Sequence, residues 1–321
     1  MTDFSKYLQI FFVVLFYWIT SISMTFANKY LVGNKFHDIS EDITMFVAWT
    51  QCAVTVVIVY IIYFFNRWIL MKKDTTLPPL KSSILFDINM IIMILSFSLM
   101  LFLNNLTLKF VGISFFQIAR SLTLVFTVIF TKIFLHKSQS VNIILCCVVV
   151  VIGFVMGIDQ EKLTGNLSIA GVLCGVVSSV FVALTGIFMK RVLTRIENNS
   201  YSLVYYMNIG STVLYLPFLL GFSQFQIVYY KKLEDNLFIV ALLLTGVLGF
   251  LINLASNMEI NFTSPTTHQI SNNAKSVLQT ILAVLIFAEL KPLFWWCSNL
   301  LVVTGAVGYT VIKYFESKNT L

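Results

Sequence analysis

The chain has 321 residues, of which 58% are hydrophobic and 11% are charged, and its formal net charge at pH 7 is +7. Soluble domains contain roughly 45–50% apolar and about 25% charged residues, so this composition excludes a soluble domain of this length. It also excludes a disordered chain, and no clustered basic face suggests a nucleic-acid partner. The sequence therefore predicts an all-α polytopic membrane protein embedded in a lipid bilayer.

Ten segments are long and apolar enough to cross a bilayer, which needs about 20 residues per helix. The connections are too short to hold a folded domain, so we expect one transmembrane domain over residues 1–321. The first segment is too long for a signal-peptide core and lacks a small-residue cleavage site after it. The predicted spans are 8–32, 43–66, 84–106, 111–135, 140–157, 168–190, 202–222, 236–257, 265–287 and 293–314.

The lysines and arginines of the connections predict the orientation. An even number of spans puts both termini on one side, and the connections on that side hold about twice as many cations as the others. By the positive-inside rule, both termini are expected in the cytosol. Three further cations, Lys29, Arg120 and Lys275, fall inside predicted spans.

The chain also shows a weak internal repeat. Sliding the sequence by 152 residues aligns four identical pairs and places the third and fourth spans on the eighth and ninth. Because five spans separate the copies, the halves 1–157 and 158–321 are expected to be inverted relative to each other. Inverted repeats are typical of secondary transporters, with the substrate site near the midplane.

Arg120 and Lys275 lie near the middle of their spans, where a cation costs about 2.5–3.5 kcal/mol. Such a cation can be paired with backbone carbonyls or with a helix end. The alternative is that the missing counter-charge is a transported anion. No acid is expected at matching depth, because the candidates all fall near span ends: Asp87, Asp159, Glu161, Glu259 and Glu289.

Polar side chains follow three spans at helical spacing, so each set shares one helix face. A polar face in lipid must meet protein or a water-filled cavity, and the alternative for each stripe is hydrogen bonding between helices. A cavity with two cations, tyrosines and amides suits an anion bearing a planar heterocycle. The stripes are Gln117, Arg120, Thr123, Thr127 and Thr131; His268, Asn272, Lys275 and Gln279; and Tyr205, Asn208, Thr212 and Tyr215.

Other chemistries find little support. No phosphate-binding loop of the ATPase type is present, no metal-ligand spacing occurs among Cys and His, and no nucleophile with its base recurs at mid-depth. We therefore expect neither enzyme activity nor a cofactor, and anion exchange is the simplest coupling. Two small-residue pairs, Gly153 with Gly157 and Gly171 with Gly175, permit close helix approach within one chain or in a homodimer.

Several motifs resemble a known family. They include Asn28-Lys-Tyr-Leu31, Asn104-Asn105, Arg120-Ser-Leu-Thr123, Thr263-Ser-Pro265 and Ala274-Lys275, in order along nearly the whole chain. With them the sequence resembles the Golgi GDP-fucose carriers, within the nucleotide-sugar transporters of the drug/metabolite transporter superfamily. The resemblance implies ten helices in two inverted halves, a Golgi membrane location, and exchange of lumen-bound GDP-fucose for GMP.

The resemblance also implies roles for particular residues. A guanine-recognition motif of the family matches Tyr205 to Asn208, with Met207 in place of an Asn, and a second motif matches Ser271 to Lys275. Arg120 and Lys275 would neutralise the diphosphate. The base would contact Tyr205, Tyr206 and Asn208, and the ribose or phosphate region would contact Asn272, Asn273 and His268. The sugar end would contact Asn28 and Lys29. The predicted site also includes Ser271, Gln117, Asn104 and Asn105. Alternative substrates are GDP-mannose, a UDP-sugar or another phosphorylated organic anion, and a channel remains a further alternative.

Overall fold

The computed structural model describes residues 3–33, 43–68, 82–136, 139–163, 168–196, 200–231, 235–263, 265–287 and 291–319. Every regular element among them is a helix. The helices are α1 (Asp3–Val32), α2 (Thr44–Trp68), α3 (Ser82–Leu85), α4 (Ile88–Phe110), α5 (Ile113–Leu135), α6 (Val141–Leu163), α7 (Ile169–Arg195), α8 (Ser200–Gly221), α9 (Gln224–Lys231), α10 (Asn236–Phe262), α11 (Pro265–Ile286) and α12 (Leu293–Asn319).

The long helices confirm an all-α polytopic membrane protein. Within the described ranges, 9 helices are long and apolar enough to span a membrane. The ninth predicted span, 265–287, is the one outside this set and corresponds to α11, which has 22 residues. Its first half carries the polar residues His268, Ser271, Asn272, Asn273 and Lys275. This helix therefore needs a polar environment inside the protein rather than contact with lipid.

The predicted spans are correct in number and order, but several helices continue further than expected. Helix α4 ends at Phe110 instead of 106, α6 at Leu163 instead of 157, and α10 at Phe262 instead of 257. The apolar run marks the bilayer core, whereas the helix continues into the interfacial region beyond it. Two acids therefore lie inside helices rather than beyond their ends.

Those two acids are Glu161 and Glu259, which lie in the last turns of α6 and α10, near the helix ends as expected. Both side chains are buried. Glu161 accepts hydrogen bonds from Lys291 Nζ at 2.6 Å and from Trp295 Nε1 at 3.0 Å, and so joins the end of α6 to the start of α12. A buried carboxylate is tolerated here because it is paired and hydrogen-bonded.

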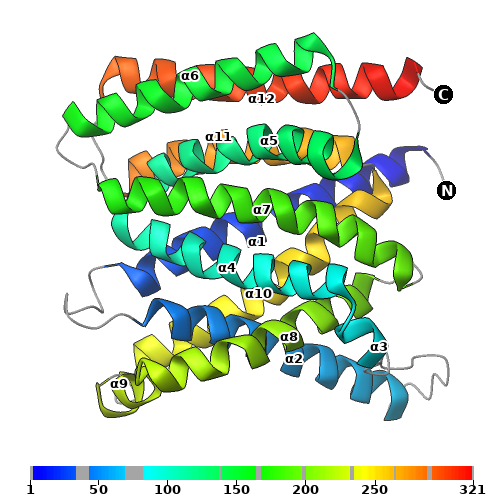
Figure 1. Cartoon of the computed structure of the whole chain (residues 1–321), viewed down its shortest axis with the longest axis vertical. Coiled ribbons are helices and arrows are strands. Elements are labelled where there is room, and N and C mark those ends of the chain that lie inside the picture. Colours follow the sequence, from blue (N-terminus) through cyan, green and yellow to red (C-terminus); the bar gives the residue numbers. More distant parts are fainter. Residues whose placement is uncertain are drawn as a thin grey trace.

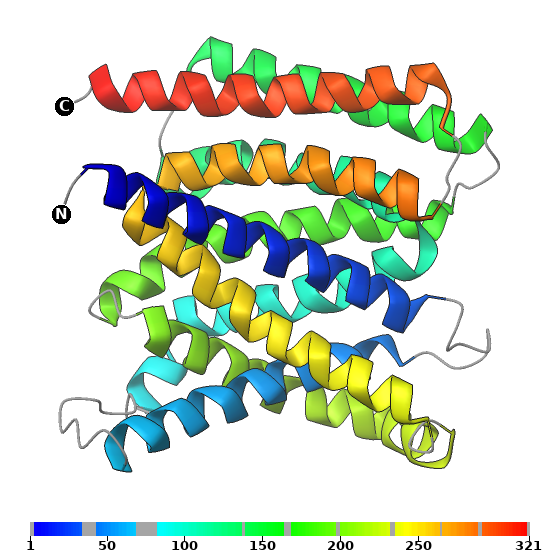
Figure 2. The same ribbon diagram turned by 180° about the vertical axis from the view of Figure 1, so that it is seen from behind.

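The long helices lie roughly side by side and form a stack (Figure 1). The α6–α12 pair lies at one end of the stack, α5 and α11 follow, and α2 and α8 lie at the opposite end. Helix α4 packs closely on α7, and α1 packs closely on α10. Figure 2 shows the stack from behind, with both chain ends again on one side of it.

The glycine pairs make close contacts within this chain. A Cβ atom at Gly153 would lie 2.8 Å from the Ser298 carbonyl oxygen on α12. A Cβ atom at Gly175 would lie 2.9 Å from the Ala119 Cβ on α5. The small residues therefore let α6 approach α12, and let α7 approach α5, without bulk between the backbones.

Candidate functional site

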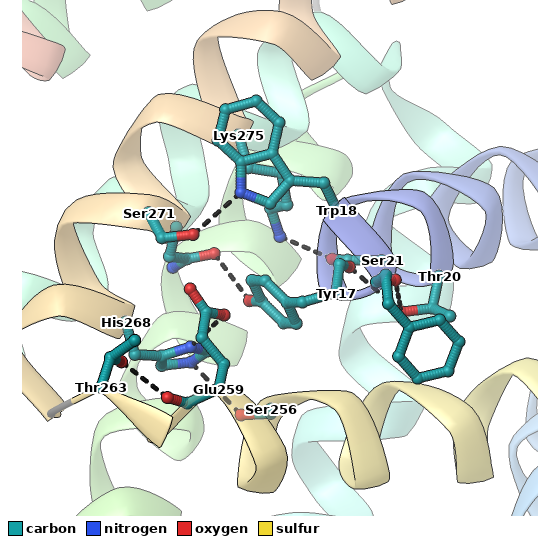
Figure 3. A network of polar contacts seen from close by, with 12 residues as sticks. Tyr17, Trp18, Thr20, Ser21, Ser256, Glu259, Thr263, His268, Ser271 and Lys275 are labelled. Atoms are coloured by element: carbon teal, nitrogen blue, oxygen red, sulfur yellow. Dashed lines mark hydrogen bonds and ion pairs between the residues drawn. The ribbon is translucent and has the colours of Figure 1, made fainter. Parts of the chain in front are cut away.

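Hydrogen bonds between α1 and α11 form the core of a polar network near the middle of the stack (Figure 3). Tyr17 donates its hydroxyl to Asn272 Oδ1 at 3.0 Å, and Trp18 Nε1 donates to Ser271 Oγ at 2.9 Å. Both α1 residues lie near the midpoint of their helix. The polar face of α11 thus meets a polar strip on α1 that the sequence analysis did not identify.

Lys275 extends this network toward the centre of the bundle. Its Nζ donates to Ser21 Oγ at 2.6 Å and lies 5.1 Å from the centroid of the Tyr17 ring. The side chain is 7% exposed. A hydroxyl and a ring face offer a buried ammonium only partial compensation, because neither carries a full negative charge.

Glu259 on α10 supplies a negative charge near this network. Its Oε2 lies 2.8 Å from His268 Nδ1, and His268 Nε2 lies 3.2 Å from Ser256 Oγ. The carboxylate acts electrostatically on Lys275 and on Tyr17. Glu259 lies in the last turn of α10, near a span end as expected, and meets the network through His268, whose ring centroid lies 4.7 Å from that of Tyr17. Among the described residues, no hydrogen bond or ion pair joins Glu259 to Lys275.

Arg120 on α5 is exposed, although its neighbours Ile118, Ala119 and Leu122 are buried. The guanidinium carbon lies 5.9 Å from the centroid of the Phe116 ring. Among the residues that the structure describes, Arg120 has no hydrogen bond and no ion pair. Its helix α5 contacts α11, which carries Lys275, and both helices contact α1.

Several buried amide and hydroxyl atoms on α4, α5 and α11 have no hydrogen-bond partner within the described part of the chain. They are Asn104 Oδ1, Asn105 Nδ2, Thr123 Oγ1 and both polar atoms of Gln279. Thr123 lies one turn from the arginine on α5, and Gln279 lies one turn from the lysine on α11. An unmade hydrogen bond at a buried polar group costs about 1–3 kcal/mol, so such groups favour a ligand that supplies partners.

Two predicted residues on α1 have protein partners instead. Lys29 Nζ donates to the carbonyl oxygens of Leu108 at 2.6 Å and Val111 at 2.8 Å. Asn28 Oδ1 accepts from Gln51 Nε2 at 2.8 Å. Lys29 therefore follows the alternative considered for intramembrane cations, which is pairing with the carbonyls of a helix end.

The α8 residues predicted to bind a base lie outside the network. Tyr205, Tyr206 and Asn208 are buried. Tyr205 packs with Val59 of α2 and Phe250 of α10, while Asn208 Nδ2 donates to the Val204 carbonyl of its own helix at 2.7 Å. No contact among the described residues links these three side chains to the two cations.

The other members of that α8 stripe bond to neighbouring backbone. Tyr215 donates its hydroxyl to the Ser98 carbonyl of α4, and Thr212 Oγ1 donates to the Asn208 carbonyl at 2.8 Å. Hydrogen bonding between and within helices, the alternative given for this stripe, thus accounts for it in the conformation described.

The remaining predicted residues lie on the site helices. Asn273 Nδ2 on α11 donates to Thr310 Oγ1 of α12 at 3.3 Å, and Gln117 is half-buried on α5. Tyr17, Trp18 and Ser21 were missed because an aromatic pair in an apolar helix reads as core or as lipid contact. Over the described ranges, no group of three or more His, Cys, Asp or Glu residues is arranged to hold a metal ion.

Comparisons with known proteins agree with this architecture. A family model described as the Triose-phosphate Transporter family matches residues 8–309. The GDP-fucose transporter of Caenorhabditis elegans is 36% identical over 322 residues, covering 99% of this chain and 87% of that protein. The Drosophila melanogaster protein named "GDP-fucose transporter, Golgi" is 36% identical over 323 residues, covering 97% of this chain and 92% of that protein.

One solved crystal structure shares the fold. It is 13% identical, with a TM-score of 0.54 over 97% of this chain and 99% of that chain. Similarity at this level supports the fold alone. The family match, in contrast, extends over almost all of the helices described above, and the chain therefore belongs to the triose-phosphate transporter family.

Proposed function

We propose that this chain is a nucleotide-sugar antiporter of the Golgi membrane that imports GDP-fucose into the lumen in exchange for GMP. The names of relatives that align with nearly the whole chain support the substrate. The family membership supports transport rather than catalysis. GMP as the counter-substrate and the direction of transport follow from the resemblance.

The observation that carries the proposal is the pair of mid-helix cations on α5 and α11, two helices that contact each other and α1. Arg120 has no hydrogen-bond partner among the described residues, and Lys275 has only a hydroxyl and a ring. A diphosphate would provide the strongly charged acceptors that both groups lack, with Arg suited to bidentate contact and Lys acting as a point charge. The unpartnered amides nearby would bind hydroxyl groups of the ribose and the sugar.

The same cations favour exchange over uniport. A vacant site leaves buried positive charge without an anion, and this penalty is expected to slow the switch of the empty carrier between its two facing states. Glu259 reduces this penalty only in part, because it is already paired with His268. Because Glu259 is a buried acid near this network, proton coupling is a further outcome to be tested.

The packing is consistent with two inverted halves. In an inverted repeat each helix of the first half corresponds to the helix five spans later, so α1 corresponds to α7 and α4 to α10. The α4–α7 contact then corresponds to the α1–α10 contact, and both pairs pack closely. The α6–α12 and α2–α8 contacts each join a helix to its own counterpart. We propose the division between the halves predicted near residue 157 to lie at the end of α6, which continues to Leu163. We propose that one half rocks against the other with both termini in the cytosol.

The base-binding role of Tyr205, Tyr206 and Asn208 requires a change of conformation. These side chains are packed away from the cations in the structure. Movement of α8 relative to α2 and α10 would be needed to bring them to a nucleotide whose phosphates contact Arg120 and Lys275.

A homodimer is a separate proposal. The glycine contacts described above lie within one chain and do not bear on it.

Counter-exchange in proteoliposomes tests the proposal. Vesicles preloaded with GMP should take up labelled GDP-fucose, and empty vesicles should not. GDP-mannose and a UDP-sugar serve as competing substrates, and an imposed pH gradient without internal nucleotide tests proton coupling. Uptake into empty vesicles would indicate a channel or uniporter, and preference for UDP-sugars would contradict guanine recognition. Retained exchange by folded Lys275→Ala protein would contradict the phosphate role.

A further inference from the structure

A cavity of about 430 Å³ lies between α5 and α6, on the lipid-facing side of the stack. Its volume is within the range of about 300–1,000 Å³ that is usual for small-molecule sites. The residues of this α5–α6 groove are Val125, Val128, Ile129, Lys132, Gln139, Ile144, Cys147, Val148, Val151 and Ile152.

The polar and apolar lining residues of the α5–α6 groove are separated along its length. Lys132 lies in the last turn of α5, and Gln139 precedes the start of α6. From this polar mouth the apolar lining extends to Val125 on α5, about two turns or about 10 Å away, and to Ile152 on α6, about three turns or about 16 Å from the start of that helix. The groove therefore has a cationic end at the α5–α6 connection and an apolar body directed toward the membrane centre.

A second cation reaches the same mouth from α12. Lys313 Nζ donates to Gln139 Oε1 at 2.9 Å. Lys132 is exposed, and no acid is among the residues that line the groove. The predicted orientation places this connection in the cytosol, where the adjoining leaflet carries anionic lipids.

We propose that the α5–α6 groove binds one anionic phospholipid of the cytosolic leaflet. An acyl chain fills the apolar body, and the head-group phosphate contacts Lys132 and Lys313. Basic pockets between transmembrane helices on the cytosolic side recognise anionic head groups in this way. A soluble anion would make no use of the apolar body, and a zwitterionic lipid would make little use of the two cations.

This lipid site is separate from the proposed transport site. With 3.6 residues per turn, Val125, Ile129 and Lys132 lie roughly 120–180° round α5 from Arg120. The lipid would therefore contact the face of α5 opposite to the face that carries Arg120. The inference does not depend on the identity of the transported solute.

Native mass spectrometry of the purified full-length protein tests the inference, with phosphatidylinositol and phosphatidylcholine of identical chains as probes. Val148→Trp fills the groove, and Ile152→Trp is a second variant in case the first does not fold. Leu145→Trp is the matched control, since Leu145 is 57% exposed on the same helix but does not line the groove. The charge variant is Lys132→Gln with Lys313→Gln, and its control is Lys190→Gln on α7.

We expect wild type and both controls to retain one phosphatidylinositol per chain in preference to phosphatidylcholine. The Trp variants should lose the bound lipid, and the double Lys variant should lose the preference by about 10- to 30-fold. Equal retention of the two lipids by wild type would overturn the proposal. Undiminished lipid binding by the folded Val148→Trp and Ile152→Trp variants would also overturn the proposal. A dimer that forms when the wild-type groove is free of lipid, and is lost in the Trp variants, would show that a second copy of the chain occupies the groove and would likewise overturn it.

Discussion

Replacement of Lys275 by Met separates stability from ligand binding in this protein. The change keeps a long unbranched side chain but removes the ammonium that donates to Ser21 and lies over the Tyr17 ring. Because the position is 7% exposed, water cannot substitute for the lost contacts. The structure therefore allows the two consequences of the substitution to be estimated separately.

For the empty carrier the opposing contributions nearly cancel. Removal of a cation from mid-membrane relieves about 2.5–3.5 kcal/mol. It sacrifices a charge-assisted hydrogen bond of about 1.5–3 kcal/mol and a cation–π contact of about 0.5–2 kcal/mol. The free energy of unfolding should therefore stay within about 2 kcal/mol of wild type. For the ligand, loss of one charged hydrogen bond should weaken GMP binding about 10- to 150-fold.

Thermal unfolding with and without GMP measures both effects. At a GMP concentration of 100 times the wild-type Kd, wild type gains about 2.7 kcal/mol, whereas a variant weakened 100-fold gains only about 0.4 kcal/mol. Lys275→Arg keeps the charge and serves as the control. Equal stabilisation of wild type and Lys275→Met by GMP would refute the reasoning, as would a large loss of stability in the ligand-free variant.

Three further substitutions test other parts of the structure. Lys29→Met removes two hydrogen bonds to the end of α4 and should lower the free energy of unfolding by about 1–3 kcal/mol. The midpoint of a thermal-shift titration with GMP should not change. A changed midpoint with unchanged stability would favour a substrate role for Lys29. Gly153→Leu forces bulk against the α12 backbone and should destabilise by about 1–3 kcal/mol or more in thermal unfolding, whereas Gly186→Leu, with nothing within 4 Å of its Cβ, should be nearly neutral. Glu259→Gln keeps the shape of the side chain that contacts His268 but removes a negative charge near the site. Calorimetry should therefore show GMP binding that is tighter by on the order of 1 kcal/mol, or about fivefold. Weaker binding would contradict this account.

Composition and periodicity were sufficient to predict the fold class and the order of the spans. A bilayer requires long apolar helices, and this requirement is visible in any window of the sequence. The same reasoning identified Arg120 and Lys275, because a cation in the middle of an apolar run stands out against its neighbours. The glycine pairs were also recognised as contact points, although not the helices that they contact.

The partners of the polar groups could not be predicted. Helical spacing shows that His268, Asn272 and Lys275 share one face, but not that this face meets Tyr17 and Ser21 on α1. The reason is that helices in lipid associate through close packing and specific hydrogen bonds, without a hydrophobic driving force that periodicity would reveal.

The sequence by itself thus determined which helices cross the membrane and which two cations lie at mid-depth. Only the tertiary structure decided that Lys29 caps a helix end, that Glu259 joins the network, and that the α8 tyrosines are packed away from it. Each of these outcomes depends on a contact between two helices: the partners of Lys29 and Tyr205 are distant in the chain, whereas Glu259 meets His268 on the next helix. Such contacts follow from the packing of whole helices, and they cannot be predicted from the sequence of one helix alone.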